Sequence, residues 1–496
     1  MDGEKNISNF NQALWLGIGQ LCTYLIAFLT APILTRYFDK IEYGTYRQIL
    51  YVYSSLMSLF TLGLPTVFAY FIPRMNAPQQ KTLIKTINRI FTGLGLLFSC
   101  MLYFTSDYLA DILNNPELAT GLKLFSPFPL FTLPTMGVEG IYTALKKTKF
   151  IAIYQVVSKS LMFLCIVLPV IIFNTGYKEA IIGWGIASFI TFIMAMHLKN
   201  RPYVGVKAEY IPNLYKSIFI YCLPLTGAFI TGFVCNSSDQ FFVSRYYGIE
   251  TYALYATGIF TIPIIPMIAS SVKNVLVPII SKAEADNRLS EALVTYRTAV
   301  KRSSLIIIPM LAFCFFFSTD IMIALFGKPY ASSSSYFKIN IIKDLILIFP
   351  YFALLAALGL NKFYMNLHVI GAIAIPALDI IICKLMLPSQ FILVVSASFF
   401  ILCSVSSFLY LKKKKNLIVI DRDLINYLLG MILHCTLILG ILYILRIFLF
   451  QNLNVFISLF LLGSVYYGLL ISSGYMLDYQ YAESLTSLIK RKNEKR

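Results

Sequence analysis

The chain has 496 residues, of which 58% are hydrophobic and 13% are charged, and its formal net charge is +18. A water-soluble domain of this composition would expose one continuous apolar surface, which excludes the soluble classes of protein. The mean hydropathy of +0.74 places most of the chain in lipid. The basic residues form short clusters between apolar runs rather than one long face. This pattern is typical of membrane topology and argues against nucleic acid as a partner.

Apolar runs of about 20 residues, the length that crosses a bilayer as a helix, recur along the chain. They predict fourteen spans, at 12–34, 47–72, 87–106, 123–145, 151–173, 179–198, 216–238, 250–272, 302–323, 337–359, 363–386, 390–411, 424–448 and 455–476. The predicted fold class is therefore an all-α integral membrane protein with about 14 transmembrane helices.

The distribution of positive charge predicts the orientation of these spans. An even number of spans places both termini on one side of the membrane. If that side is cytoplasmic, 29 of the 41 lysines and arginines lie in the termini and cytoplasmic loops, and 10 lie in the opposite loops. The remaining two, Lys159 and Lys343, lie inside spans. Because cytoplasmic loops are enriched in Lys and Arg, both termini are expected in the cytoplasm.

The spans divide into two groups of six and an appended pair. We expect an N-terminal lobe over 1–200 and a C-terminal lobe over 201–411. Two further spans and a basic cytoplasmic tail occupy 412–496, beyond the boundary marked by LKKKK (411–415). The longest polar interval, 281–304, has an apolar stripe with charges opposite, which predicts an amphipathic helix in the membrane interface.

Residues 31–50 and 242–259 align without a gap at an offset of 209. The identities are Arg36/Arg245, Tyr37/Tyr246, Tyr43/Tyr252 and Tyr46/Tyr255. Each stretch lies where one apolar run ends and the next begins, as expected of a duplicated membrane protein. The two lobes should then have parallel topology and be pseudo-symmetric. The two arginines are either interfacial anchors of helix ends or part of the extracytoplasmic rim of a cleft that binds an anion.

Ionisable side chains inside the predicted spans are costly and usually face a cavity or each other. The turn between the fourth and fifth spans places Glu139 and Lys159 at similar depth, roughly 14–17 Å from that turn. The turn between the tenth and eleventh spans places Lys343 level with Asp379. Each pair is either a structural ion pair or part of a polar cavity in which the lysine meets an anionic headgroup.

Motifs for covalent chemistry are not found in the sequence. It has no HExxH, GxSxG or GxxxxGK[ST] motif and no paired-carboxylate loop. The nine cysteines are scattered without CxxC spacing, and the three histidines (His197, His368 and His434) lie on three different spans or their ends. We therefore expect no metal site and no cofactor, and transport rather than enzymatic activity.

Four segments resemble, in the same order, segments of the polysaccharide transporters in the multidrug/oligosaccharidyl-lipid/polysaccharide exporter superfamily. They are LTRYFDKIEYGTYRQI (34–49), TLGLPTVFAYFIPR (61–74), LPLTGAFITGFVCNSSDQFFVSRYYG (223–248) and LFGKPY (325–330). The resemblance implies two six-helix lobes that face each other across a central cleft and alternate between inward-open and outward-open states.

The same resemblance implies a flippase in the bacterial inner membrane. Its cargo would be a polyprenyl-diphosphate-linked oligosaccharide used to make O-antigen lipopolysaccharide, capsule or exopolysaccharide. Besides the lipid bilayer, the glycan polymerase and chain-length machinery are candidate partners. The candidate substrate-binding residues are Lys159, Glu139, Arg36, Arg245, Lys343 and Asp379.

Three other functions stay open from the sequence. A drug/cation antiporter of the same superfamily is expected to carry an acidic residue in the first span, and a peptidoglycan-precursor flippase is expected to carry arginines there. Residues 12–34 contain neither. A polytopic glycan polymerase or transferase would normally have a long catalytic loop on the extracytoplasmic side, where the predicted loops are short.

Overall fold

The computed structural model describes residues 9–449 and 453–476, and every regular element in these two ranges is a helix. The basic tail predicted at 490–496 lies outside the described residues. The chain divides into two compact units, Met1–Ala253 (unit 1) and Leu254–Arg496 (unit 2). Each unit is described by itself.

The helices of unit 1 in the described ranges are α1 (Asn9–Tyr37), α2 (Lys40–Phe60), α3 (Pro65–Phe71), η1 (Ile72–Arg74), α4 (Ala77–Ile112), α5 (Pro116–Phe125), α6 (Phe128–Thr132), η2 (Leu133–Thr135), α7 (Val138–Ala144), α8 (Thr148–Phe173), α9 (Tyr177–Asn200), η3 (Arg201–Tyr203) and α10 (Leu214–Tyr246). Helix α11 (Ile249–Gly258) contains the boundary between the units.

The helices of unit 2 in the described ranges are α12 (Ile264–Ala285), α13 (Leu289–Phe316), α14 (Ser318–Phe326), η4 (Lys328–Ser333), α15 (Ser334–Leu345), η5 (Ile346–Ile348), α16 (Tyr351–Ala357), α17 (Asn361–Lys384), α18 (Gln390–Lys415), α19 (Arg422–Leu449) and α20 (Val455–Met476).

Twelve helical segments among the described residues are long and apolar enough to cross a membrane. The chain is thus an all-helical multi-pass membrane protein, but the predicted count of 14 spans is not confirmed. The predicted spans at 123–145 and 216–238 are not among the twelve. The first of these is divided among α5, α6, η2 and α7, whereas the second lies within the single 33-residue helix α10. The predicted span at 250–272 is also divided, between α11 and the start of α12.

Prolines and one glycine break the predicted span at 123–145. Proline lacks a backbone N–H and its ring clashes with the preceding turn, so Pro127 and Pro134 interrupt the helix where the side chains remain apolar. Gly137 then adopts φ +90°, and a Cβ atom there would lie 2.0 Å from the ring of the buried Phe68. Only glycine fits this position, which starts α7.

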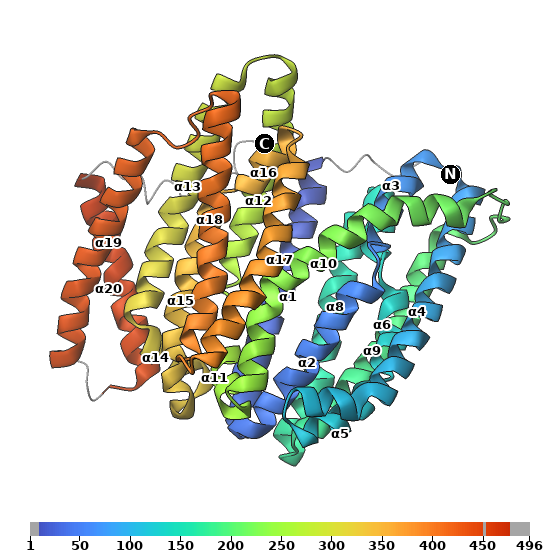
Figure 1. The fold of residues 1–496 in the computed structure, drawn as a ribbon, viewed down its shortest axis with the longest axis horizontal. Coiled ribbons are helices and arrows are strands. Elements are labelled where there is room, and N and C mark those ends of the chain that lie inside the picture. Colours follow the sequence, from blue (N-terminus) through green and yellow to red (C-terminus); the bar gives the residue numbers. More distant parts are fainter. Residues whose placement is uncertain (1–8, 450–452, 477–496) are drawn as a thin grey trace. The chain divides into compact units, whose positions relative to one another are not determined.

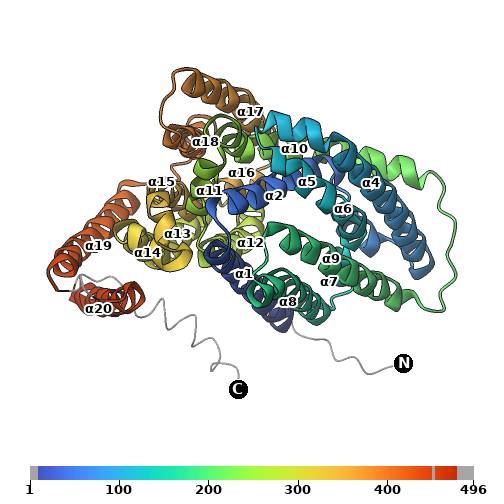
Figure 2. The same cartoon turned by 90° about the horizontal axis from the view of Figure 1, so that it is seen from below.

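Unit 1 is held together by a cluster of aromatic rings between its helices. Helix α8 packs against α1 and α9, and α4 packs against α5 and α6 (Figures 1 and 2). The ring of Tyr53 in α2 lies 5.8 Å from that of Phe98 in α4 and 4.9 Å from that of Phe128 in α6. Phe128 in turn contacts Trp184 of α9 at 5.2 Å. Such offset and edge-to-face contacts stabilise beyond the area they bury.

The connection from η3 to α10 is fastened to the start of α4. The Lys81 ammonium donates to the backbone oxygens of Tyr203 at 3.0 Å and Val206 at 2.6 Å. The Thr82 hydroxyl donates to the backbone oxygen of Glu209 at 2.5 Å. These bonds fix the path of an otherwise irregular segment.

Helix α13 is the centre of unit 2, where it packs against α12, α15 and α19. Helices α19 and α20 lie beside α13 and α14 (Figures 1 and 2). Arg297 of α13 forms an ion pair of 2.8 Å with Asp421, just before α19. Arg446 of α19 pairs with Asp320 of α14.

The structure corrects the predicted interfacial helix at 281–304. This polar interval forms the adjoining ends of α12 and α13, joined by a short turn at 286–288. The apolar stripe, including Leu293, Tyr296 and Val300, is buried within the protein. The amphipathic pattern therefore reflects helix packing rather than contact with a membrane surface.

The strain and crowding at Gly137 predict the effect of adding one methyl group. Gly137→Ala should lower the free energy of unfolding in mixed micelles by about 2 kcal/mol or more, because it adds a clash with Phe68 to the cost of positive φ. The matched control is Gly205→Ala, where φ is +78° but no atom lies within 4 Å. An equal loss of stability in both variants would show that the packing against Phe68 contributes nothing.

Candidate functional site

The repeat predicted around Arg36 and Arg245 falls on equivalent local structures. Helix α1 ends at Tyr37 and α10 at Tyr246, and the next helices begin at Lys40 and Ile249, so both boundaries keep the offset of 209. The matched tyrosines share their environments. The pairs Tyr43/Tyr252 and Tyr46/Tyr255 are buried, and the pair Tyr37/Tyr246 is exposed.

The two arginines themselves have different surroundings. Arg36 is exposed in the last turn of α1. Arg245 is half-buried, and its guanidinium donates to the backbone oxygen of Ile112 at the end of α4. The Asn114 side chain donates back to the Arg245 backbone oxygen at 3.0 Å. Arg245 therefore joins the ends of α4 and α10.

A buried polar network connects α2 to two neighbouring elements. The Gln48 side chain is fully buried; its Nε2 donates to Ser244 Oγ of α10 at 2.8 Å, and its Oε1 accepts from Asn115 Nδ2 at 2.5 Å. Asn115 Nδ2 also donates to Thr45 Oγ1 at 3.0 Å. The Asn115 Oδ1 atom accepts a hydrogen bond from the Glu117 backbone N–H and so caps the start of α5. Sequence patterns did not indicate this network.

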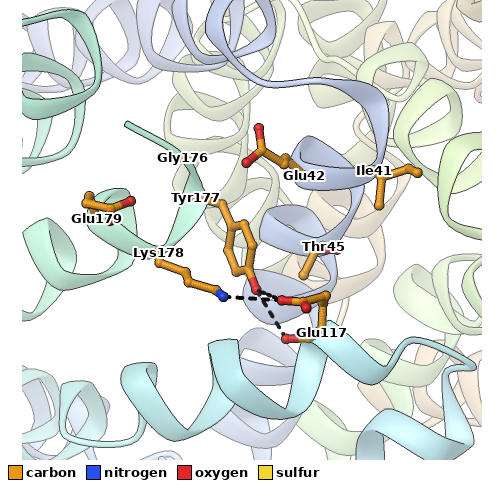
Figure 3. Close-up of a pocket in the computed structure, with 8 residues that line it drawn as sticks. All are labelled: Ile41, Glu42, Thr45, Glu117, Gly176, Tyr177, Lys178 and Glu179. Atoms are coloured by element: carbon orange, nitrogen blue, oxygen red, sulfur yellow. Dashed lines mark hydrogen bonds and ion pairs between the residues drawn. The ribbon is translucent and has the colours of Figure 1, made fainter. Parts of the chain in front are cut away.

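A polar cavity of about 370 Å3 lies beside this network, among the starts of α2, α5 and α9 (Figure 3). Its lining residues are Ile41, Glu42, Thr45, Glu117, Gly176, Tyr177, Lys178 and Glu179. Tyr177 and Lys178 point toward Glu117: the Tyr177 hydroxyl donates to Glu117 Oε2 at 2.8 Å, and Lys178 Nζ lies 3.5 Å from the same oxygen. The cavity suits a ligand that donates hydrogen bonds, such as the hydroxyl groups of a sugar.

The partners of Glu117 stabilise its charged form. The hydrogen bond from Tyr177 is the larger cause and the charge of Lys178 the next, and together they lower the pKa of the Glu117 carboxyl below its ordinary value of 4.5. Glu42, across the cavity, is held close to Gly176, where a Cβ atom would lie 2.7 Å from its Oε1.

The structure brings the helices of Glu139 and Lys159 together, and the two charges interact without forming an ion pair. Helices α7 and α8 are in contact. Glu139 is exposed and accepts a hydrogen bond from Gln155 Nε2 at 2.8 Å. Lys159 is half-buried one turn further along α8, and among the described residues no carboxylate lies within 4.0 Å of its ammonium.

Lys343 and Asp379 lie on α15 and α17 of unit 2. Asp379 is fully buried, whereas Lys343 is half-buried. The Lys343 ammonium lies 3.5 Å from Ser396 Oγ and over the ring of Phe400 at 4.9 Å. The Lys343 ammonium thus contacts two side chains of α18. Asp344, the next residue, is buried as well.

Lys199 and Lys273 are among the cations that the sequence analysis counts with the loops but that lie inside candidate spans. Lys199 of α9 is fully buried and donates to Asn88 Oδ1 at 2.9 Å and to the Pro134 backbone oxygen at 2.8 Å. No pattern indicated this, because its acceptors are distant in sequence. Lys273 of α12 is exposed, 4.8 Å above the Phe352 ring. The polar residues at positions 270, 273 and 274 share one face of the helix. This spacing indicates, from the sequence alone, that the apolar span continues past Lys273 with a polar face.

Among the described residues, no group of three or more His, Cys, Asp or Glu side chains could hold a metal ion. What the chain offers is a set of cations inside apolar helices and a polar cavity at the ends of three helices. A lysine within a lipid-crossing helix is costly unless it meets a cavity, an anion or a partner group.

The fold is that of known membrane transporters. The lipid II flippase MurJ, in an inward closed conformation, matches with a TM-score of 0.68 at 16% identity, over 95% of this chain and 99% of that chain. A multidrug resistance transporter of the MATE family, outward-facing and of the MOP superfamily, matches with a TM-score of 0.56 at 11% identity, over 82% of this chain and 95% of that chain. The class is thus a multi-pass membrane protein with the fold of MOP superfamily transporters.

The sequence identifies the family of the chain within that class. Residues 10–284, more than half of the chain, match the family described as polysaccharide biosynthesis protein, and the chain belongs to that family. The succinoglycan biosynthesis transport protein ExoT of Rhizobium meliloti (strain 1021) is 24% identical over 332 residues, which are 64% of this chain and 62% of that relative. The chain thus spans about three fifths of the relative's length. The membership confirms the resemblance noted from sequence.

Removing the Gln48 side-chain amide should destabilise unit 1. Gln48→Leu leaves the Ser244 hydroxyl and one Asn115 donor without their partner, which costs about 1–3 kcal/mol. Thermal unfolding in detergent should show the loss, and Ser244→Ala added to Gln48→Leu should cost less than the sum of the two single variants. Gln20→Leu, on the exposed face of α1, is the matched control and should change little. Additive effects of the two substitutions would contradict a direct Gln48–Ser244 bond.

The Glu117 carboxyl should titrate below its ordinary pKa, and Tyr177 should matter more than Lys178. A group whose pKa is lowered on folding contributes stability above its unfolded pKa and loses it as the pH falls through the folded pKa. The Tyr177–Glu117 contact should therefore persist at neutral pH and be lost below about pH 4.5. Carboxyl carbon NMR of labelled protein should show a larger rise in the Glu117 pKa in Tyr177→Phe than in Lys178→Gln. The reverse order would contradict the hydrogen bond from Tyr177 as the larger cause of the lowered pKa of Glu117.

Proposed function

We propose that this chain is a flippase that moves polyprenyl-diphosphate-linked oligosaccharide units across the bacterial inner membrane. The observation that carries the proposal is Lys159, a half-buried ammonium inside a membrane-crossing helix with no ion-pair partner among the described residues. Family membership and the MOP fold support it. The exported units would serve O-antigen, capsular or exopolysaccharide synthesis, with the glycan polymerase and chain-length machinery as further partners.

The physics of the cargo explains the need for such a cation. A diphosphate headgroup cannot cross hydrocarbon unless the protein replaces its hydration with cations and hydroxyl groups. Lys159 in unit 1 is the first cargo cation that we propose. Lys273 is the second, because it is exposed on a candidate span of unit 2. We propose that Lys343 and Asp379 are structural, since the Lys343 ammonium lies on Ser396 and Phe400 of its own unit.

The mechanism that fits this cargo is alternating access. The lobes 1–200 and 201–411 would enclose a cleft that opens in turn to each side, while the lipid tail of the cargo stays in the bilayer. Arg36 and Arg245 would lie at the extracytoplasmic rim, and both termini in the cytoplasm. Outward movement of negative charge is electrically downhill by about 2.3 kcal/mol per charge per 100 mV.

A second candidate cargo is a peptidoglycan precursor. The likeness of the fold to a lipid II flippase over 95% of the chain favours it. The first predicted span, 12–34, carries no arginine, which argues against the same mode of headgroup binding. It also carries no acidic residue, which argues against drug/cation antiport. Reconstituted protein offered both lipid-linked glycans would separate the two flippase activities.

Replacing Lys159 should slow transport without loss of the protein. Because Glu139 is bonded to Gln155, Lys159→Met strands no ion-pair partner. We expect the variant to reach the membrane at normal abundance and to translocate lipid-linked oligosaccharide at least about tenfold more slowly, the effect of losing one hydrogen bond to a charged group. Lectin accessibility of the glycan in proteoliposomes measures the rate, and surface glycan at matched abundance measures export in cells.

Lys149→Met is the control, because Lys149 is an exposed lysine at the start of the same helix. It should leave transport unchanged. Normal export by the Lys159 variant would remove this residue from the cargo path. Wild-type protein that moves no lipid-linked glycan in proteoliposomes would overturn the flippase proposal itself.

A further inference from the structure

Lysines gather at one end of the α17–α18 hairpin in unit 2. Lys362 is the second residue of α17, and the lysines 412–414 lie in the last turn of α18. The two helices pack against each other, and the rings of Phe363 and Tyr410 stack with centroids 4.0 Å apart. This stacking brings the start of α17 beside the end of α18. We call Lys362, Lys412, Lys413 and Lys414 the lysine cluster.

No acidic residue neutralises the lysine cluster within its own helices. All four side chains are exposed, and the segments 361–376 and 402–416 contain no Asp or Glu. Lys414 donates to the neutral Tyr410 hydroxyl at 2.9 Å. The adjacent Lys415 differs, because it forms an ion pair of 2.9 Å with Glu284 of α12. The cluster therefore keeps its positive charge at the surface.

The cluster lies at the level of the lipid headgroups. The apolar part of α18, Gln390–Leu411, is about 33 Å long at 1.5 Å per residue, close to the thickness of the hydrocarbon core. The lysines follow directly, and the stacked rings of Phe363 and Tyr410 take the interfacial position that aromatic residues prefer. The side expected for this end is cytoplasmic.

Apolar side chains adjoin the cluster on its membrane side. Leu409 and Val405 of α18 and Met365 of α17 are exposed within about two turns of the lysines. A ligand bound here meets ammonium groups at one end and an exposed apolar surface at the other. A phospholipid has both parts, whereas a free phosphate or a nucleic acid has no acyl chain for the apolar surface.

We propose that the lysine cluster binds anionic phospholipid, with the headgroup phosphate on the lysines and the acyl chains against α17 and α18. Like charges at neighbouring positions repel one another, and a phosphate bridging Lys362 to Lys412 or Lys413 relieves that repulsion. The bound lipid also bridges the two helix ends. This binding is separate from cargo transport and does not depend on the proposed function.

Native mass spectrometry of the purified full chain tests the proposal. The protein in detergent is titrated with phosphatidylglycerol, and with zwitterionic phosphatidylcholine in parallel. We expect retained phosphatidylglycerol to exceed phosphatidylcholine, and the variant Lys362→Gln/Lys412→Gln/Lys413→Gln to bind phosphatidylglycerol at least about tenfold more weakly. Lys414 is left in place because of its bond to Tyr410.

The matched control removes three lysines from the other end of unit 2. Lys384 is the last residue of α17, and Lys328 and Lys338 lie near the start of α15, where Tyr336 contacts Ser389 before α18. The variant Lys328→Gln/Lys338→Gln/Lys384→Gln has the same net charge and should bind within twofold of wild type. Arginines in place of Lys362, Lys412 and Lys413 should preserve binding, which separates lost charge from misfolding.

Three results would overturn the proposal. They are equal binding by the cluster variant and wild type, equal weakening in the cluster and control variants, and equal retention of phosphatidylcholine. Competition by glycerol 3-phosphate tests whether a phosphate without acyl chains binds the lysine cluster. Glycerol 3-phosphate should not displace bound phosphatidylglycerol at equal concentration, and full displacement would mean that the site recognises phosphate without the lipid.

Discussion

A backbone carbonyl that loses its helical partner within a membrane must find another donor, because no water is there to supply one. In this chain a long cationic side chain closes one such break, at η2, and two others hold the end of α4 and the connection between α18 and α19 in the same way. Lys199 donates to the Pro134 oxygen, Arg245 to the Ile112 oxygen and Arg297 to the Val419 oxygen. Each of these bonds joins segments more than 60 residues apart. Part of the excess of basic residues thus serves to hold irregular backbone, in addition to setting the orientation of the spans.

The hydropathy pattern predicted the helices that run unbroken and did not predict where others break. Eleven of the fourteen expected spans correspond to candidate spans in the structure, and the expected span 250–272 overlaps only the first part of a twelfth, Ile264–Ala285. The span at 123–145 was misjudged because Pro127, Pro134 and Gly137 stand among apolar residues, so the segment stays hydrophobic while its helix is interrupted. The interval 281–304 was misjudged because an apolar stripe has the same period whether it faces lipid or another helix.

The candidate site shows a similar division between what spacing can and cannot predict. The helical rise predicted that Glu139 and Lys159 belong to adjacent helices, which α7 and α8 are. It could not predict that the Glu139 carboxylate accepts its hydrogen bond from Gln155, which lies one turn before Lys159 in α8. The network around Gln48 and the contacts of Lys199 join residues far apart in sequence, and only the packed structure brings them together. The spacing of the polar residues around Lys273 could have placed it on a helix within the membrane. It was assigned to a loop because the predicted apolar run ends at residue 272.

The packing of the last two helices has a consequence for how the chain is made. Arg297 and Asp320 belong to α13 and α14, whereas their partners Asp421 and Arg446 follow more than 120 residues later. Synthesis proceeds at about 5–20 residues per second, so Asp320 waits roughly 6–25 s for Arg446 to be made. During that interval its carboxylate stands near the membrane without the guanidinium. Unit 2 therefore completes these two contacts only after α19 has been made.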